Sequence, residues 1–151
     1  MPIREFQEKD APYVKELVNS ILFKEFPFSS KAYQIDDIDS ISKAYNGQRD
    51  IFYVMEESGK IVGTAGIKED TKQVALLRRV YVNSALRGKG IGSSLMNTAI
   101  DFCRQRGYRQ VVFRSTSQMQ GAINLCLRKG FKEDERLNLG DIQIIKFVLK
   151  I

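Results

Sequence analysis

The stretch Arg87-Gly88-Lys89-Gly90-Ile91-Gly92 decides the fold of this 151-residue chain. It stands between a β-branched segment that ends at Val82 and an amphipathic segment that begins near Gly90. Its three alternating glycines permit backbone conformations that other residues avoid, so amide N–H groups can crowd around a ligand oxygen. The expected helix adds unpaired N–H groups and the positive end of its dipole, which together bind phosphate. The stretch therefore predicts a strand, a phosphate-binding turn and a helix.

Two common phosphate-binding patterns fail on this stretch. A P-loop would need Gly where Asn83 stands and Ser or Thr where Gly90 stands. A Rossmann fingerprint would need a third Gly in the place of Ser93 and would follow its strand directly, whereas residues 83–87 intervene here. The pattern R-x-x-G-x-G fits completely. Of the three patterns, it alone matches this stretch.

Positive charge is concentrated around the same stretch. The net charge of the chain is +6, and residues 78–114 hold eight Lys or Arg against a single acid, Asp101. Residues 1–77 carry instead a net charge of −3. A solvated basic face would explain such a block, but its position around a glycine-rich turn predicts an anion-binding site.

Length and composition indicate one globular domain, which we expect to span residues 1–151. The chain has no His, which excludes Ser-His and Cys-His catalytic pairs and histidine metal sites. Cys103 and Cys126 lack the spacing of a zinc or thioredoxin-type motif, so we expect no metal. No apolar run reaches the ~18 residues of a membrane span, and the first residues are too polar for a signal peptide. We therefore expect a cytoplasmic protein with no membrane partner.

The hydrophobic pattern predicts the remaining elements. The expected strands are 3–6, 51–57, 60–68, 74–82, 111–113, 131–139 and 142–149. The expected helices are 11–25, 35–45, 90–106 and 119–129. The order is therefore β-α-α-β-β-β-α-β-α-β-β. A strand–helix–strand core within an otherwise antiparallel meander predicts an α/β fold with a mixed sheet.

With the strand Leu77 to Val82 before it, the stretch 87–92 resembles the acetyl-CoA signature of the GNAT superfamily of N-acetyltransferases. The segment 119–131, which ends in Gly130-Phe131, resembles the later helix of that superfamily. The element order agrees as well, so the resemblance covers nearly the whole chain. It implies a GNAT-like acyl-CoA N-acyltransferase fold. It also implies an enzyme that moves the acetyl group of acetyl-CoA to a primary amine of a small molecule or peptide by direct attack.

The resemblance also implies which residues contact acetyl-CoA, the acyl donor. The residues expected to hold the CoA pyrophosphate are Arg87, Gly88, Lys89, Gly90, Ile91, Gly92 and Ser93. The backbone of Val80, Tyr81 and Val82 is expected to pair with the pantetheine arm.

The chain departs from the superfamily at both catalytic positions. Cys126 stands where a Tyr often protonates the leaving thiolate. It is therefore the candidate acid, although a buried packing role is the simpler interpretation. Many members of the superfamily carry a Glu that acts as general base on the strand before the turn, but residues 75–77 of this chain hold no acid. The nearest acids, Glu69 and Asp70, lie in an expected turn. The sequence thus names no general base, and a chain of water molecules could serve instead.

Acceptor and partners are less sharply defined by the sequence. The aromatic segment 23–33 would either line an acceptor pocket or anchor to the core, and the acidic first half favours a cationic amine acceptor. The missing Tyr and Glu leave open an acyl-CoA sensor of GNAT fold without turnover. A basic nucleic-acid-binding module is a further alternative. We expect no nucleic-acid partner, however, because the helix 90–106 carries Arg104 and Arg106 only at its end. A homodimer is compatible with the sequence.

Overall fold

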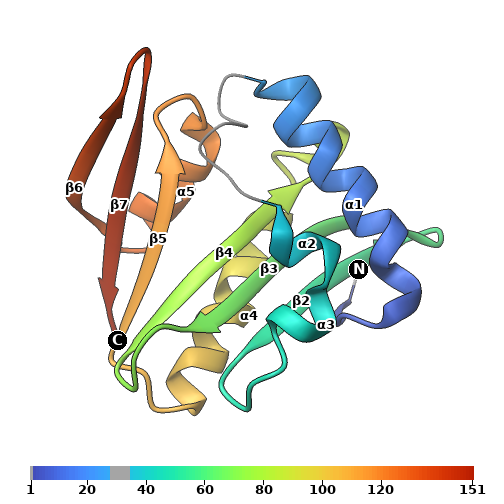
Figure 1. Ribbon diagram of the computed structural model, residues 1–151, viewed down its shortest axis with the longest axis horizontal. Coiled ribbons are helices and arrows are strands. Elements are labelled where there is room, and N and C mark those ends of the chain that lie inside the picture. The colour runs from blue at the N-terminus through green and yellow to red at the C-terminus, as the bar shows by residue number, and fades with distance from the viewer. Residues whose placement is uncertain (1, 28–34) are drawn as a thin grey trace.

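A mixed sheet runs through the middle of the computed structural model, which describes residues 2–27 and 35–151 (Figure 1). Within these residues the sheet has seven strands in the order β1-β2-β3-β4-β5-β7-β6. The strands are β1 (Ile3–Glu5), β2 (Ile51–Glu57), β3 (Lys60–Glu69), β4 (Val74–Val82), β5 (Gln110–Thr116), β6 (Lys132–Leu139) and β7 (Ile142–Lys150). Neighbouring strands are antiparallel except β4 and β5, which are parallel. The predicted α/β fold and mixed sheet are confirmed.

Helices cover both faces of this sheet (Figure 1). One face carries α1 (Ala11–Asn19), its π-helical continuation η2 (Ser20–Glu25), and the short helices α2 (Asp36–Asp39) and α3 (Ile41–Ala44). The other face carries α4 (Ile91–Gln105), and α5 (Gln120–Arg128) contributes to the same core as α4. Within the described residues, short 3-10 turns are formed by Glu8–Asp10 and Ser84–Leu86. Among the described residues no helix has both the length and the hydropathy to cross a bilayer.

The helix expected over residues 35–45 is in fact broken into α2 and α3, so this prediction is wrong in detail. Ser40 leaves the helical region, with φ −146° and ψ 59°. The apolar pattern is still satisfied, because Ile38 and Ile41 on either side of the break are both buried. The carboxylate of Asp37 binds Arg79 of β4, a contact that hydrophobic periodicity does not reveal. The irregular segment expected over 28–34 lies outside the described residues.

The sheet splits between β4 and β5, and this split positions the site. The two strands pair only from Val74↔Gln110 to Leu77↔Phe113. Beyond that point β5 stays with β7 and β4 stays with β3. The far half of β4 therefore has no strand partner on its β5 side among the described residues, which leaves backbone N–H and C=O groups available on that edge.

A bulge in the same half of β4 changes which side chains face the split. Opposite β3 the register shifts between Tyr81 and Arg78, and Arg79 takes a positive φ of 57°. A bulge inserts one extra residue into a strand and re-aims its side chains. Here both Arg78 and Arg79 reach Asp37 of α2, on the face that α1, α2 and α3 cover.

Candidate active site

The first of two pockets, about 350 Å³, lies where β4 meets the N-terminus of α4. Every predicted CoA-contacting residue except the exposed Lys89 lines it. They are Val80, Tyr81, Val82, Arg87, Gly88, Gly90, Ile91, Gly92 and Ser93. Its lining also includes Ile21 of η2, Phe26 just after η2, and Asn124 and Arg128 of α5. The structure thus brings the glycine-rich turn and the end of β4 together around one space.

The glycine-rich turn has the geometry of an anion cradle. Gly88 and Gly90 both take φ of +81°, and a Cβ added at either would meet no atom within 4 Å. Gly90 also begins α4 without any side-chain cap. The backbone amides of residues 88–93 donate no hydrogen bond to other described residues. These donors, together with the positive end of the helix dipole, suit the pyrophosphate of CoA.

Several charged side chains surround the turn. Arg87 is held by hydrogen bonds within the protein: its Nε donates to the carbonyl of Val82 at 3.1 Å and its Nη2 donates to Glu25 at 2.8 Å. Lys129 at the end of α5 donates to the hydroxyl of Ser93 at 2.5 Å, which brings a cation to the start of α4. Arg128 lines the pocket beside it. The glycine-rich motif did not predict that Glu25, Arg128 and Lys129 lie near this turn.

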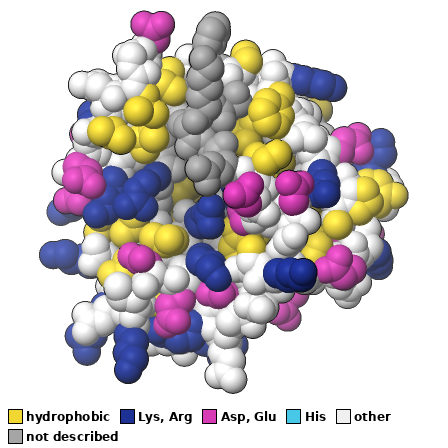
Figure 2. All heavy atoms as spheres, in the orientation of Figure 1, with side chains coloured by type: hydrophobic (Ala, Val, Ile, Leu, Met, Phe, Trp, Pro, Cys, Tyr) yellow, Lys and Arg dark blue, Asp and Glu magenta, His cyan; other side chains and the backbone are white. Residues whose placement is uncertain are grey.

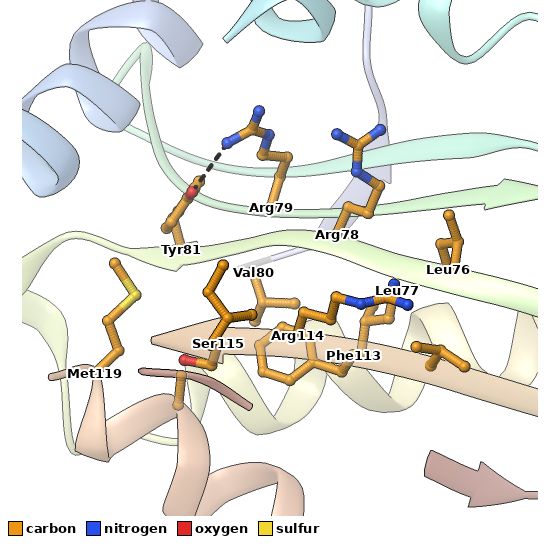
Figure 3. A pocket seen from close by; sticks show the side chains of 13 residues that line it. Leu76, Leu77, Arg78, Arg79, Val80, Tyr81, Phe113, Arg114, Ser115 and Met119 are labelled. Atoms are coloured by element: carbon orange, nitrogen blue, oxygen red, sulfur yellow. Dashed lines mark hydrogen bonds between the residues drawn. The ribbon is translucent and has the colours of Figure 1, made fainter. Parts of the chain in front are cut away.

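A second pocket, about 380 Å³, occupies the split between β4 and β5 (Figure 3). Its walls are Leu76 to Tyr81 of β4 and Val112 to Ser115 of β5, closed by Met119, Ala122 and Ile144. Four residues, Val80, Tyr81, Met119 and Ala122, line both pockets. The two spaces therefore adjoin along the end of β4.

A buried ion pair holds the bulge of β4 in place. The guanidinium of Arg79 donates to both oxygens of Asp37, from Nη2 at 2.6 Å and from Nε at 3.0 Å. Its Nη1 contacts the hydroxyl of Tyr81 at 3.2 Å, as Figure 3 shows, and Tyr45 donates to Asp37 at 2.7 Å. The hydroxyl of Thr64 donates to the carbonyl of Arg79 at 2.7 Å. This network fixes the strained backbone at Arg79.

The network sets the ionisation of its members. Burial by itself would raise the pKa of Asp37, but the hydrogen bonds and charge of Arg79 hold that pKa below its ordinary value. Burial raises the pKa of Tyr81 above its ordinary value, although the neighbouring Arg79 acts in the opposite direction. At neutral pH the pair is therefore Asp37 carboxylate with Arg79 guanidinium, beside a neutral Tyr81 hydroxyl. The sequence signal for this ion-pair network is the pair of arginines inside an otherwise apolar strand.

Cys126, the candidate acid, lies in the core between α5 and the sheet. It is fully buried, lines neither pocket, and its thiol donates to the carbonyl of Ile123 at 3.2 Å. Burial raises the pKa of this thiol to about 12. This placement supports the packing interpretation. A proton-donating role for Cys126 stays a prediction.

The other sequence candidates lie apart from the two pockets. Glu69 and Asp70 sit at the hairpin before β4, where Glu69 pairs with Arg49, and neither lines a pocket. Of the aromatic segment 23–33, Phe26 lines the first pocket and Phe23 is exposed, while residues 28–33 lie outside the described part.

Comparison with known proteins gives the family. The model of the Acetyltransferase (GNAT) family matches residues 12–131, which include the glycine-rich turn, the split strands and α5. The chain belongs to the GNAT acetyltransferase family. The predicted resemblance is thereby confirmed.

Sequence relatives that are called N-acetyltransferases agree with this family membership. The chain is 36% identical over 115 residues to a protein named probable N-acetyltransferase camello from Xenopus tropicalis, covering 74% of this chain and 52% of that one. It is 35% identical over 125 residues to N-acetyltransferase 8 of Rattus norvegicus, covering 74% and 56%. The chain thus spans about half the length of these relatives.

Solved structures share the fold of this GNAT domain. An acetyltransferase from Streptococcus agalactiae superposes with a TM-score of 0.84 at 18% identity, covering 99% of this chain and 98% of that one. A Salmonella typhimurium protein determined with its cofactor acetyl-CoA gives 0.82 at 22% identity, covering 99% and 93%. At these identities the likeness concerns the fold.

Proposed function

We propose that this GNAT domain is an N-acetyltransferase that moves the acetyl group of acetyl-CoA to a primary amine. The observation that carries the proposal is the junction of two pockets on β4. One pocket presents the free amides of residues 88–93, which suit a pyrophosphate, and the other opens between the split strands. Because Val80 and Tyr81 line both, a donor held in the first can present its acetyl group to an acceptor in the second.

On the donor side, the free amides of the turn and the cations Arg128 and Lys129 would hold the pyrophosphate. The open edge of β4 at Val80 to Val82 would offer backbone groups to the pantetheine arm, as a strand does to its neighbour. Acetyl-CoA supplies the activated thioester carbonyl.

On the acceptor side, the amine nitrogen forms a bond to the acetyl carbon while the carbon–sulfur bond breaks. The amine loses a proton and the leaving thiolate gains one. Of the described residues that line the two pockets, none is Asp or Glu, and the chain contains no His. We therefore propose that water removes the amine proton, with the Tyr81 hydroxyl, held by Arg79, as the polar group where the pockets meet.

The experiment is a rate measurement with purified protein, acetyl-CoA and a panel of primary amines. Release of free CoA thiol is followed, and acetylated amine is identified by mass spectrometry. We expect thiol release that depends on both protein and amine and that saturates with each substrate. Binding of acetyl-CoA without amine-dependent release would contradict catalysis and favour an acyl-CoA sensor of the same fold.

A further inference from the structure

We infer that the acceptor amine also carries a carboxylate, bound in the split between β4 and β5 by Arg78 and Arg114. The inference rests on the proposed function, because it concerns the acceptor of that same reaction. The acidic first half of the chain favours a cationic amine, and the inference adds a carboxylate to that acceptor. Four features of the second pocket support it.

Arg114 on β5 is a cation without a counter-charge. It lines the second pocket and is exposed there, and Figure 3 shows its side chain extending along the gap between the two strands. It forms no ion pair with any residue in 2–27 or 35–151. The remaining residues, 1 and 28–34, include no Asp or Glu. The chain therefore offers Arg114 no carboxylate of its own.

The position of Arg114 within the sheet adds a like charge to its surroundings. Its cross-strand neighbour on β7 is Lys146, and like charges directly opposite each other destabilise a sheet. Lys146 is compensated by Asp134 of β6, with 3.3 Å between Nζ and Oδ2. Arg114 has no such compensation. An anion bound at Arg114 would remove the repulsion.

Arg78 on β4 supplies a second cation on the facing strand. Its Nη2 lies 3.9 Å from Asp37, whereas Arg79 holds the same carboxylate at 2.6 Å and 3.0 Å. Asp37 is thus largely neutralised by Arg79. Arg78 follows Leu77 of the α4-side core, so strand alternation turns it to the opposite face, beside the pocket and Arg79 (Figure 3).

The rest of the lining defines what such an acceptor looks like. Three arginines, no Asp and no Glu line the pocket among the described residues, and guanidinium groups bind carboxylates with paired hydrogen bonds. Leu76, Val112 and Ile144 add apolar surface between these cations. The phosphate-binding turn, residues 87–93, contributes nothing to this lining. The pocket therefore suits a small amino acid with an apolar side group, separately from the phosphates of CoA.

The test compares matched amines that differ only in the carboxylate. Acetylation of phenylalanine and of phenylalaninamide is measured with wild type, Arg78→Gln, Arg114→Gln and the control Arg109→Gln, an exposed arginine outside both pockets. We expect wild type and the control to prefer phenylalanine by about tenfold or more in kcat/KM. Each pocket variant should lose about tenfold on phenylalanine and little on the amide. Equal use of the two amines by wild type would overturn the inference while acetyl transfer stands.

A binding measurement keeps the inference apart from the proposed function. The melting temperature of the CoA-saturated protein is recorded with N-acetylphenylalanine and with N-acetylphenylalaninamide. We expect a rise with the acid that is absent with the amide and absent in Arg114→Gln. Equal shifts, or none, would overturn the carboxylate site whatever the activity. Failure to acetylate any amine alongside the expected shifts would instead overturn the proposed reaction.

Discussion

The glycine-rich turn and the pocket between the split strands adjoin on β4, yet they are built in different ways. The turn takes its donors from one continuous stretch, residues 88–93, and uses backbone amides. The split pocket collects its charged side chains from separate strands, Arg78 and Arg79 from β4 and Arg114 from β5. Asp37 of α2 does not line the pocket but holds Arg79 in place. The first region therefore depends on local conformation, and the second on ion pairs between distant parts of the chain.

The largest expected effect is the loss of stability on removing the buried ion pair beside the second region. Arg79→Met leaves the carboxylate of Asp37 buried without its partner, which costs about 3–5 kcal/mol of unfolding free energy. Urea unfolding measures the loss. The double variant Arg79→Met with Asp37→Leu removes both charges and should be more stable than Arg79→Met alone. A double variant whose cost is the sum of two single costs would show that the pair does not hold the bulge.

The same pair predicts how stability responds to pH. Arg79 holds the pKa of Asp37 below its unfolded value, against the effect of burial. Asp37 therefore contributes stability that is fully present above its unfolded pKa, about 3.9, and is lost as pH falls through its lower folded pKa. We expect the difference in unfolding free energy between wild type and Asp37→Asn to shrink as pH falls below about 4. A difference that stays constant down to pH 2 would contradict this role.

The next effect breaks the first region and leaves the second intact. Gly90→Val places a side chain where the pyrophosphate is expected, and no protein atom within 4 Å obstructs it. We expect affinity for CoA to fall by about 100-fold or more, measured by calorimetric titration.

Gly107→Val is the matched control for that change. Gly107 follows the other end of α4, with φ of +80° and equally open surroundings, so it carries similar backbone strain, about 1–3 kcal/mol, away from the pocket. Equal CoA affinity in the two variants would mean that strain, and not the cradle, explains the loss.

The smallest effect concerns Cys126, which belongs to neither region. Its buried thiol packs in the core, so Cys126→Ala should lower kcat by less than about tenfold and cost about 1 kcal/mol of stability. Cys103→Ala, another fully buried thiol whose pKa is also raised to about 12, is the control. A loss of about 100-fold or more in kcat for Cys126→Ala alone, with CoA affinity unchanged, would make this thiol the proton donor.

The contrast between the two regions also explains what the sequence could predict. The turn and its helix are encoded by neighbouring residues, so the motif at Arg87 to Gly92, through its resemblance to the GNAT signature, predicted the fold. The same resemblance named part of the lining of the first pocket, but not Ile21, Asn124 or Arg128. The order of helices and strands along the chain followed from turn and periodicity signals. These predictions needed no knowledge of distant contacts.

The second pocket depends on register and on long-range charge pairing, which periodicity does not encode. The break at Ser40, the pairing of Asp37 with Arg79, and the bulge that re-aims Arg79 involve contacts between α2 and β4. The isolation of Arg114 follows from the register of β5 against β7. Adjacent arginines in an apolar strand were the signal that the sequence offered.

The most direct test of acetyl-CoA as the donor held at the glycine-rich turn is the melting temperature of the protein with candidate nucleotides. Acetyl-CoA at about a hundredfold its Kd should add about 2.7 kcal/mol to the unfolding free energy and raise the melting temperature accordingly. ATP and NAD should raise it much less, because the turn fits neither a P-loop nor a Rossmann fingerprint. An unchanged melting temperature at millimolar acetyl-CoA would contradict the assignment of the turn.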